Sequence, residues 1–187
     1  MTLAELLSDL DLSSFIAFDL ETTGLSSEND EIIEIAAQRF ENGELTSRFT
    51  SLINPKMSIP PFISELTSIS NEMVHNAPYL KDELHGLLEF FGDDPIVGQN
   101  IDFDLEFLKK ACKSHNHPFP DFKAIYDTST LSRSLLYSHH DFSLSGISTF
   151  YDLDVTNAHR ALADTINTGK VFVHLIQEAA SLPLSML

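Results

Sequence analysis

Hydrophobic and polar residues follow two different periods along this chain. A period of two, which is typical of strands, predicts strands at 15–21, 31–40 and 44–53. The last two strands flank Asn42-Gly43, and Asn-Gly is the strongest short signal for a β-hairpin. The first three strands are therefore expected to form a meander.

Elsewhere, helical periodicity alternates with short apolar runs. Thr2 and Glu5 form a capping-box pattern, which predicts a short helix within residues 1–12. The later segments are predicted as helices at 79–91, 103–115, 129–137, 143–150 and 160–180 and strands at 96–99 and 124–127. This order indicates an α/β fold with a mixed five-stranded sheet flanked by helices.

Length and composition favour one domain. The 187 residues are 43% hydrophobic, enough for a sizeable core, and no long Pro-, Gly- or Ser-rich linker divides them. We expect a single domain over 1–187, with its core at about 14–177 and a C-terminal tail at 178–187. The apolar tail could dock on a polymerase or sliding clamp, although an ordinary frayed or packed terminus is the commoner interpretation.

The first strand ends in two acidic residues on one face. Because side chains alternate along a strand, Asp19 and Glu21 point the same way, with Cα atoms roughly 6–7 Å apart. Both carboxylates could reach one hard cation or a closely spaced pair. The alternative is a strand that runs out into a solvated acidic turn.

A second acidic pair precedes a predicted helix. On a helical wheel Asp104 falls inside the apolar arc, whereas Asp102 falls on the opposite, polar side. A buried aspartate needs compensation for its charge, so Asp104 is the candidate ligand and Asp102 the candidate helix cap. The alternative for Asp104 is a carboxylate satisfied by backbone donors.

The last long helical segment begins with a further acid and a histidine. Asp164 lies at the flank of its apolar face, and His159 comes five residues earlier, a spacing that does not share one helical face. We therefore expect His159 on the loop or first turn, where it could swing over the site and transfer a proton. An ordinary surface histidine is the alternative on spacing alone.

These residues together resemble the three motifs of the DEDDh, or DnaQ-like, exonucleases. The matching segments are Phe-Asp-Leu-Glu-Thr-Thr-Gly at 18–24, Gly-Gln-Asn at 98–100 followed by Phe103-Asp104, and His159 with Asp164. Weaker similarity extends over about 14–177. The resemblance implies a ribonuclease H-like fold and a metal-dependent nuclease that removes nucleotides one at a time from a 3′ end.

The chemistry of phosphodiester hydrolysis fits the same residues. It needs an activated water, a neutralised phosphate and a stabilised leaving oxygen, which two cations roughly 3.5–4 Å apart can provide. We expect Asp19, Glu21, Asp104 and Asp164 to hold two divalent ions. Mg²⁺ or Mn²⁺ is favoured because all these ligands are oxygens. His159 is then the expected general base.

The resemblance also implies contacts with the substrate strand. Thr22 and Leu25 would meet the terminal nucleotide, Gly24 would let the backbone approach it, and Asn100 would position the strand. Ordinary turn and loop chemistry is the alternative for these four residues. Two positions depart from the family pattern, since Gln99 replaces a frequent His and a frequent Gly is replaced by Ser68.

Single-stranded DNA is the favoured substrate. Leu-Glu-Thr-Thr-Gly at 20–24 is similar to the proofreading subunits or domains of bacterial DNA polymerase III and to helicase-associated exonuclease domains, so a role in DNA proofreading or repair is expected, with release of nucleoside 5′-monophosphates. The alternatives are an RNA-trimming exonuclease of the same fold and a non-catalytic nucleic-acid-binding module. The complete set of five acidic and histidine residues argues against the second alternative.

Net charge changes the picture of how such an enzyme would reach its substrate. At a formal charge of −17, the chain should bind phosphate backbones weakly by itself. We expect distributive action on short 3′ ends, or delivery by a partner such as a polymerase or helicase. The cluster of Lys109, Lys110 and Lys113 is interpreted as a solvated helix face rather than a DNA contact.

The remaining features concern location. A single Cys gives no disulfide, and the acidic N-terminus lacks the basic region of a signal peptide. No segment is apolar over the length that a membrane requires. We therefore expect a cytoplasmic protein without a membrane anchor.

Overall fold

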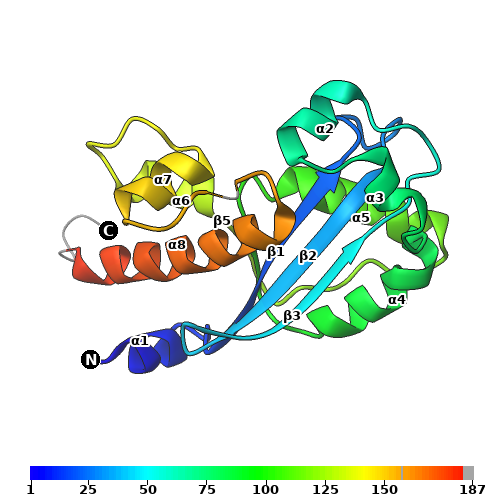
Figure 1. The fold of residues 1–187 in the computed structure, drawn as a ribbon. Coiled ribbons are helices and arrows are strands. Elements are labelled where there is room, and N and C mark those ends of the chain that lie inside the picture. Colours follow the sequence, from blue (N-terminus) through cyan, green and yellow to red (C-terminus); the bar gives the residue numbers. More distant parts are fainter. Residues whose placement is uncertain (157, 183–187) are drawn as a thin grey trace.

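Five strands form one mixed sheet in the computed structural model, which describes residues 1–156 and 158–182 (Figure 1). The strands are β1 (Ser14–Thr22), β2 (Ile32–Glu41), β3 (Glu44–Leu52), β4 (Ile96–Gly98) and β5 (Ile125–Asp127). Their order is β3-β2-β1-β4-β5; β1 and β3 pair antiparallel with β2, and the β1–β4 and β4–β5 pairs are parallel. The predicted α/β fold and its meander are confirmed.

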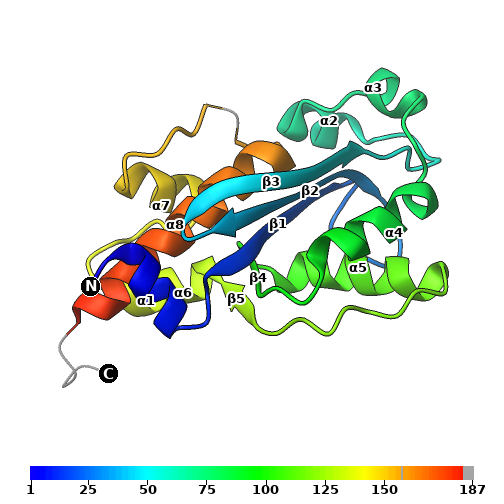
Figure 2. The same ribbon diagram turned by 90° about the horizontal axis from the view of Figure 1, so that it is seen from below.

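Helices cover both faces of this sheet. They are α1 (Leu3–Asp9), α2 (Pro61–Thr67), α3 (Asn71–His75), α4 (Leu80–Phe91), α5 (Asp102–Ser114), α6 (Thr128–Leu135), α7 (Leu144–Phe150) and α8 (Ala161–Ser181). Figure 2 shows α4 and α5 on one side of the sheet and α6, α7 and α8 on the other. From β1 onward, the predicted elements agree with these bounds to within two residues. The hydrophobic pattern of each element stops where the element stops packing against the core.

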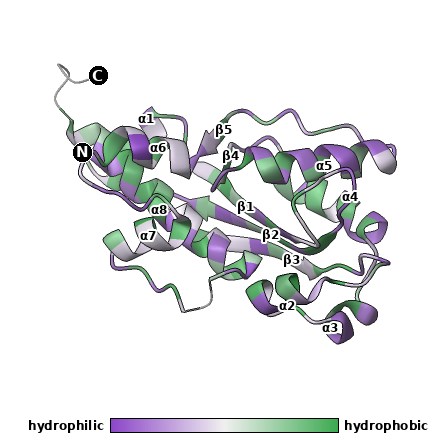
Figure 3. Cartoon of the chain, turned by 90° about the horizontal axis from the view of Figure 1, so that it is seen from above, coloured by the Kyte–Doolittle hydropathy of each residue, from purple (hydrophilic) through white to green (hydrophobic). Residues whose placement is uncertain are grey.

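The two faces of β1 pack against different helices. Phe15 contacts Phe172 of α8, whereas Phe18 contacts Phe91 of α4. The helices carry hydrophobic and hydrophilic bands, as expected when one side of each lies on the sheet (Figure 3). Asp19 and Glu21 continue the row of Phe15. Both therefore face α8 rather than α4 and α5.

Asn42-Gly43 forms the predicted tight turn between β2 and β3. Both residues have positive φ, 53° and 87°, as a type I′ turn requires. The glycine tolerates this conformation without strain. The hairpin prediction is confirmed.

The sequence did not predict α2 and α3, which lie beside the ends of β1 and β2. They contain only seven and five residues, too few for a helical period to stand out. Local signals were present, since Pro61 occupies the first turn of α2 and Ser70 caps α3. Ser68 ends α2 with φ 58°, a left-handed conformation that favours glycine.

The C-terminal helix overlaps the segment assigned to the tail. Residues 178–181 form the last turn of α8, in agreement with the helix predicted to end at 180, and residues 183–187, which make up most of the segment expected to dock, lie outside the described residues. Among the helices that the structure describes, none combines the length and apolar character needed to cross a bilayer.

Gly169 of α8 lies against Phe40 of β2, and a Cβ there would collide with the ring. We expect Gly169→Ala to lower the free energy of unfolding by about 1–3 kcal/mol, the usual cost of overpacking a core. Gly86→Ala in α4 is the matched control, because its Cβ would meet Phe49 at 3.4 Å. The control should be neutral or stabilising by up to about 1 kcal/mol. Urea unfolding measures both, and equal losses would contradict this packing.

Candidate active site

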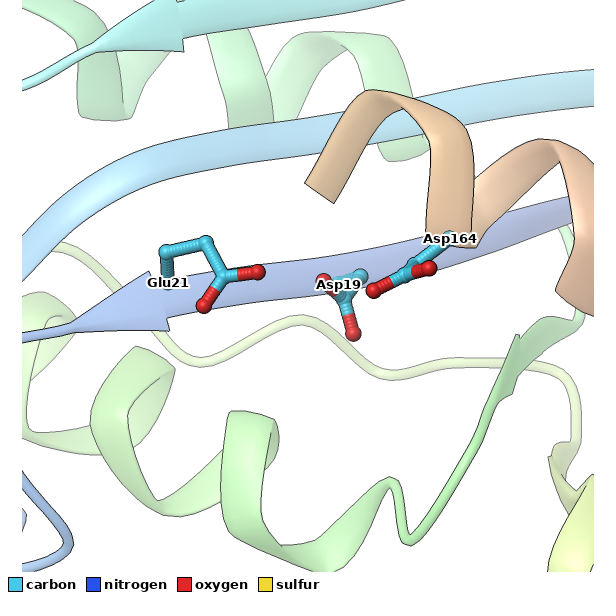
Figure 4. A group of neighbouring side chains, drawn as sticks. All are labelled: Asp19, Glu21 and Asp164. Carbon is cyan, nitrogen blue, oxygen red and sulfur yellow. The ribbon is translucent and has the colours of Figure 1, made fainter. Parts of the chain in front are cut away.

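Three carboxylates meet between the sheet and the start of α8. Asp19 and Glu21 come from β1, the central strand, and Asp164 comes from the first turn of α8. One oxygen from each lies within 4.8 Å of the other two. Figure 4 shows the three side chains gathered on the α8 side of β1. An all-oxygen group of this size can hold a hard divalent cation.

Asp104 lies beside this group and anchors α5 to it. The side chain is 3% exposed, and its Oδ1 accepts a hydrogen bond of 2.9 Å from the backbone N–H of Leu20, the residue between Asp19 and Glu21. The helical wheel predicted this inward direction. One of its oxygens is thus satisfied by a backbone donor, as in the alternative interpretation, while its negative charge still acts on Asp19.

Burial and mutual repulsion raise the pKa values of all four carboxyl groups. Burial is the largest cause in each case, and it raises the pKa of Glu21 to about 8, with repulsion from Asp164 and Glu34 added. Hydrogen bonds from backbone N–H groups oppose the rise in pKa at Asp104 and Asp164. Such an excess of negative charge would be relieved by a bound divalent cation.

His159 lies on the loop immediately before α8, as its spacing predicted. It adopts the left-handed conformation, with φ 62°, and its side chain is exposed. Its backbone N–H donates to Oδ2 of Asp164 at 3.0 Å. This bond fixes the loop relative to the acidic group. Because it uses the backbone, it does not hold the imidazole ring in one orientation. An exposed imidazole beside the acidic group is placed where it could exchange protons with solvent or a ligand.

Glu34 of β2 is a member of the site that the sequence did not reveal. It pairs across the sheet with Glu21, is 3% exposed, and accepts two bonds from Arg160, 2.7 and 3.2 Å long. A third bond, of 3.0 Å, comes from the backbone N–H of Ala161. Glu34 therefore fixes the first turn of α8, which carries Asp164. The one hint in the sequence is that Glu34 interrupts an otherwise apolar run at 32–37.

The turn after β1 carries three of the predicted substrate contacts. Thr22 is 7% exposed and donates to the carbonyl oxygen of Gly24 at 2.6 Å, which is the turn chemistry of the alternative interpretation. A Cβ at Gly24 would lie 2.5–2.6 Å from the carboxylate of Asp30, so a larger residue would displace that side chain from its bonds to Thr23 and Ser26. Leu25 is 88% exposed. This unburied leucine is available to an external ligand.

The turn between β4 and α5 holds the remaining candidates. Asn100 is exposed and has φ 56°, so its side chain is free to meet a ligand. Asp102 is the exposed first residue of α5, and no side-chain cap is present at Ile101, so the prediction of a capping role is wrong. The backbone N–H of Ile101 instead donates to Oδ2 of Asp127 at 2.9 Å, because the end of β5 lies against this turn.

Gln99, one of the two positions expected to depart from the family pattern, has a structural role. Its Nε2 donates to the carbonyl of Phe142 at 2.9 Å, and its Oε1 accepts from Thr128 at 2.6 Å. Both ends of the amide are therefore used to join β4 to α6 and to the loop before α7. An amide supplies the donor and the acceptor together, as this position needs.

Comparison with known proteins gives a consistent result. The family model RNase_T, described as Exonuclease, matches residues 16–172. A DNA polymerase III PolC-type of Caldanaerobacter subterraneus subsp. tengcongensis is 34% identical over 164 residues, 88% of this chain and 12% of that protein. The 3′-5′ exonuclease DinG of Bacillus subtilis is 36% identical over 170 residues, 90% of this chain and 18% of that protein.

The fold is also shared with solved structures. Exonuclease X, in complex with 5′ overhanging duplex DNA, superimposes with a TM-score of 0.71 at 22% identity, covering 92% of this chain and 96% of that one. This likeness confirms the expected ribonuclease H-like fold. The chain spans less than a fifth of the length of the two sequence relatives described above.

Metal-free stability should depend on pH through the acidic cluster. A group whose folded pKa is raised, such as Glu21, stabilises the fold below its unfolded value of 4.5, and that contribution is lost as the pH rises through about 8. In EDTA, the melting temperature should therefore fall as the pH rises from about 4.5 to about 8. Saturating Mg²⁺ or Mn²⁺ should raise it by roughly 5–10 °C at alkaline pH.

Glu21→Gln is the comparison for this experiment, because it removes the titrating group with little change in size. Its melting temperature in EDTA should vary less with pH than that of the wild type. Parallel pH profiles for the two proteins, together with no shift on adding metal, would contradict the role of Glu21.

Glu34→Gln should weaken both the fold and the site. It removes the charge that pairs with Arg160, and we expect the free energy of unfolding to fall by about 1–3 kcal/mol. Because the start of α8 then loses its anchor, the rise in melting temperature with Mn²⁺ should require more metal. Glu41→Gln, at an exposed position of the same strand, is the control. Identical metal titrations for the two variants would rule out this positioning role.

Proposed function

The chain belongs to the exonuclease family, and from this premise we propose that it hydrolyses single-stranded DNA from the 3′ end, releasing nucleoside 5′-monophosphates. The observation that carries the proposal is the convergence of Asp19, Glu21 and Asp164 within 4.8 Å, with buried Asp104 beside them. A module without catalysis would gain nothing from such mutually repelling, partly buried charges.

Four carboxylates would hold the metal ions. We assign Asp19, Glu21, Asp104 and Asp164 as the ligands of two divalent cations, Mg²⁺ or Mn²⁺, because the donor set consists of oxygens and carries a surplus of negative charge. Two such ions supply an activated water and stabilise charge on the phosphate and the leaving 3′-oxygen.

His159 acts in this proposal as the general base that takes a proton from the attacking water. Its backbone bond to Asp164 keeps it next to the metal ligands, and its exposed ring can turn toward a bound phosphate. General bases of this kind contribute about 10²–10⁴-fold to the rate. The exposed position also lets the imidazolium pass its proton to solvent.

The residues after β1 and β4 would position the strand. Exposed Leu25 offers an apolar surface to the terminal base, and the tight turn at Thr22 and Gly24 presents backbone groups to it. Asn100 would contact the strand near the scissile phosphate. These contacts lie at the same end of the sheet as the acidic group, since β1 and β4 run parallel.

DNA is the proposed substrate because the sequence relatives include a DNA polymerase and an exonuclease of the DinG type. By the same analogy, the acidic chain would act beside a polymerase or helicase that supplies affinity for the strand. Trimming of RNA by the same acidic group is the second candidate. Competition between matched DNA and RNA oligonucleotides separates the two.

A labelled-strand assay tests the proposal. A 5′-labelled single strand incubated with Mg²⁺ or Mn²⁺ should give a ladder shortened from the 3′ end. Asp19→Ala should abolish the ladder, and His159→Ala should lower kcat by about 10²–10⁴-fold. Asp102→Ala, an exposed aspartate close to the site, should leave activity unchanged. An inert wild type, or equal loss in the Asp19 and Asp102 variants, would refute the assignment.

A further inference from the structure

A cavity of about 330 Å³ opens on the face of the sheet away from the acidic group. Its walls come from the start of β2, the segment that follows β3, the start of α4 and the second half of α5. Asp19 and Glu21 lie on the other side of β1, together with Asp164 of α8 (Figure 4). Among the described residues that line the cavity, none is a candidate metal ligand.

Positive charge gathers at this cavity in an otherwise acidic chain. It is lined by Lys56, Lys81 and Lys110, three of only eleven Lys and Arg residues, and by His115. Glu31 is the one carboxylate among the described lining residues. The whole chain has a formal charge of −17, so this local excess of positive charge is opposite in sign to the protein's net charge. It would attract an anion.

The three ammonium groups differ in what they already bind. Lys110 is occupied, because its Nζ donates to the carboxylate of Glu31 and to the carbonyl of Asp30, both at 2.9 Å. Lys81 has only a loose, exposed contact of 3.9 Å with Asp82. Lys56 lies 4.4 Å above the ring of Tyr79, and no described carboxylate forms an ion pair with it. Lys56 and Lys81 are therefore the groups available to a ligand.

The rest of the cavity is suited to a flat apolar group. Tyr79 is 40% exposed at its rim, and the interior is lined by buried aliphatic and aromatic side chains, including Ile32, Ile53 and Phe107. Aromatic and apolar walls bind a nucleobase by stacking, and lysines bind its phosphate. The volume is at the lower end of the range for small-molecule sites, which fits one nucleotide better than a strand.

We propose that this cavity is a binding site for a nucleoside 5′-monophosphate, separate from the acidic group. Lys56 and Lys81 bind the phosphate, and the base lies against Tyr79 and the apolar interior. The wall at Glu31 and Lys110 is shared with the loop that follows β1, so an occupant lies next to the segment that carries Leu25. The site does not depend on the proposed nuclease activity.

Binding of dAMP to the Asp19→Ala chain in EDTA tests this site without contribution from metal at the acidic group. Saturable binding is expected by equilibrium dialysis with labelled dAMP. Adding Lys56→Ala and Lys81→Ala should raise Kd by about tenfold or more, because charged hydrogen bonds to phosphate are lost. Lys109→Ala with Lys113→Ala is the matched control, since it removes the same charge from α5 outside the cavity. The control should change Kd less than about twofold.

Four results would overturn the proposal. They are absence of saturable dAMP binding, equal weakening by the two double substitutions, equal affinity for inorganic phosphate, and tighter binding of a short deoxyadenosine oligonucleotide than of dAMP. The third would indicate a simple anion site, and the fourth a surface for a strand. A nuclease assay of Lys56→Ala with Lys81→Ala, made with Asp19 intact, separates this proposal from the proposed function. This variant should still shorten a labelled strand from the 3′ end, whether or not dAMP binds in the cavity.

Discussion

Repulsion among buried carboxylates is the constraint on which the rest of the structure depends. Asp19, Glu21, Asp104 and Asp164, with Glu34, bring five carboxyl groups together, and among the described residues Arg160 opposes the rise in the pKa of Glu21. Separate strands and helices must hold these groups together against their repulsion and the cost of burial. Long-range hydrogen bonds to Asp104 and Glu34 help to hold this arrangement together.

Three backbone contacts fix the acidic group. Leu20 donates to Asp104, Ala161 donates to Glu34, and His159 donates to Asp164. The first of these joins α5 to β1, the second joins α8 to β2, and the third closes the loop before α8. Asp104 and Asp164 both lie in the first turn of a helix, where the helix dipole favours negative charge. Backbone N–H groups and the first turns of α5 and α8 thus offset part of the repulsion among the carboxylates.

The distribution of charge separates two faces of the protein. The α8 face holds the acidic group, whose surplus of negative charge repels an anion. The α4–α5 face holds a cavity with several lysines, where an anion meets positive charge directly. The net charge of −17 does not show this difference, because it adds together acidic and basic groups that lie on opposite faces of the sheet. A nucleic acid would therefore experience the two faces very differently.

The sequence by itself determined the local features. Period-two alternation put Asp19 and Glu21 on one face of β1, the helical wheel turned Asp104 inward and Asp102 outward, and Asn42-Gly43 specified the hairpin. These features depend on neighbours a few residues away. The capping role expected for Asp102 failed because Asp127, from another strand, satisfies the start of α5 instead.

Only the tertiary structure decided which distant residues complete the site. Glu34 meets Arg160 across 126 positions in the chain, through the register of β2 on β1 and the place where α8 lies on the sheet. The lysines of the opposite cavity likewise come from three separate segments. Periodicity reports which side of an element is buried, but not which element covers it, because that choice depends on the packing of the whole core.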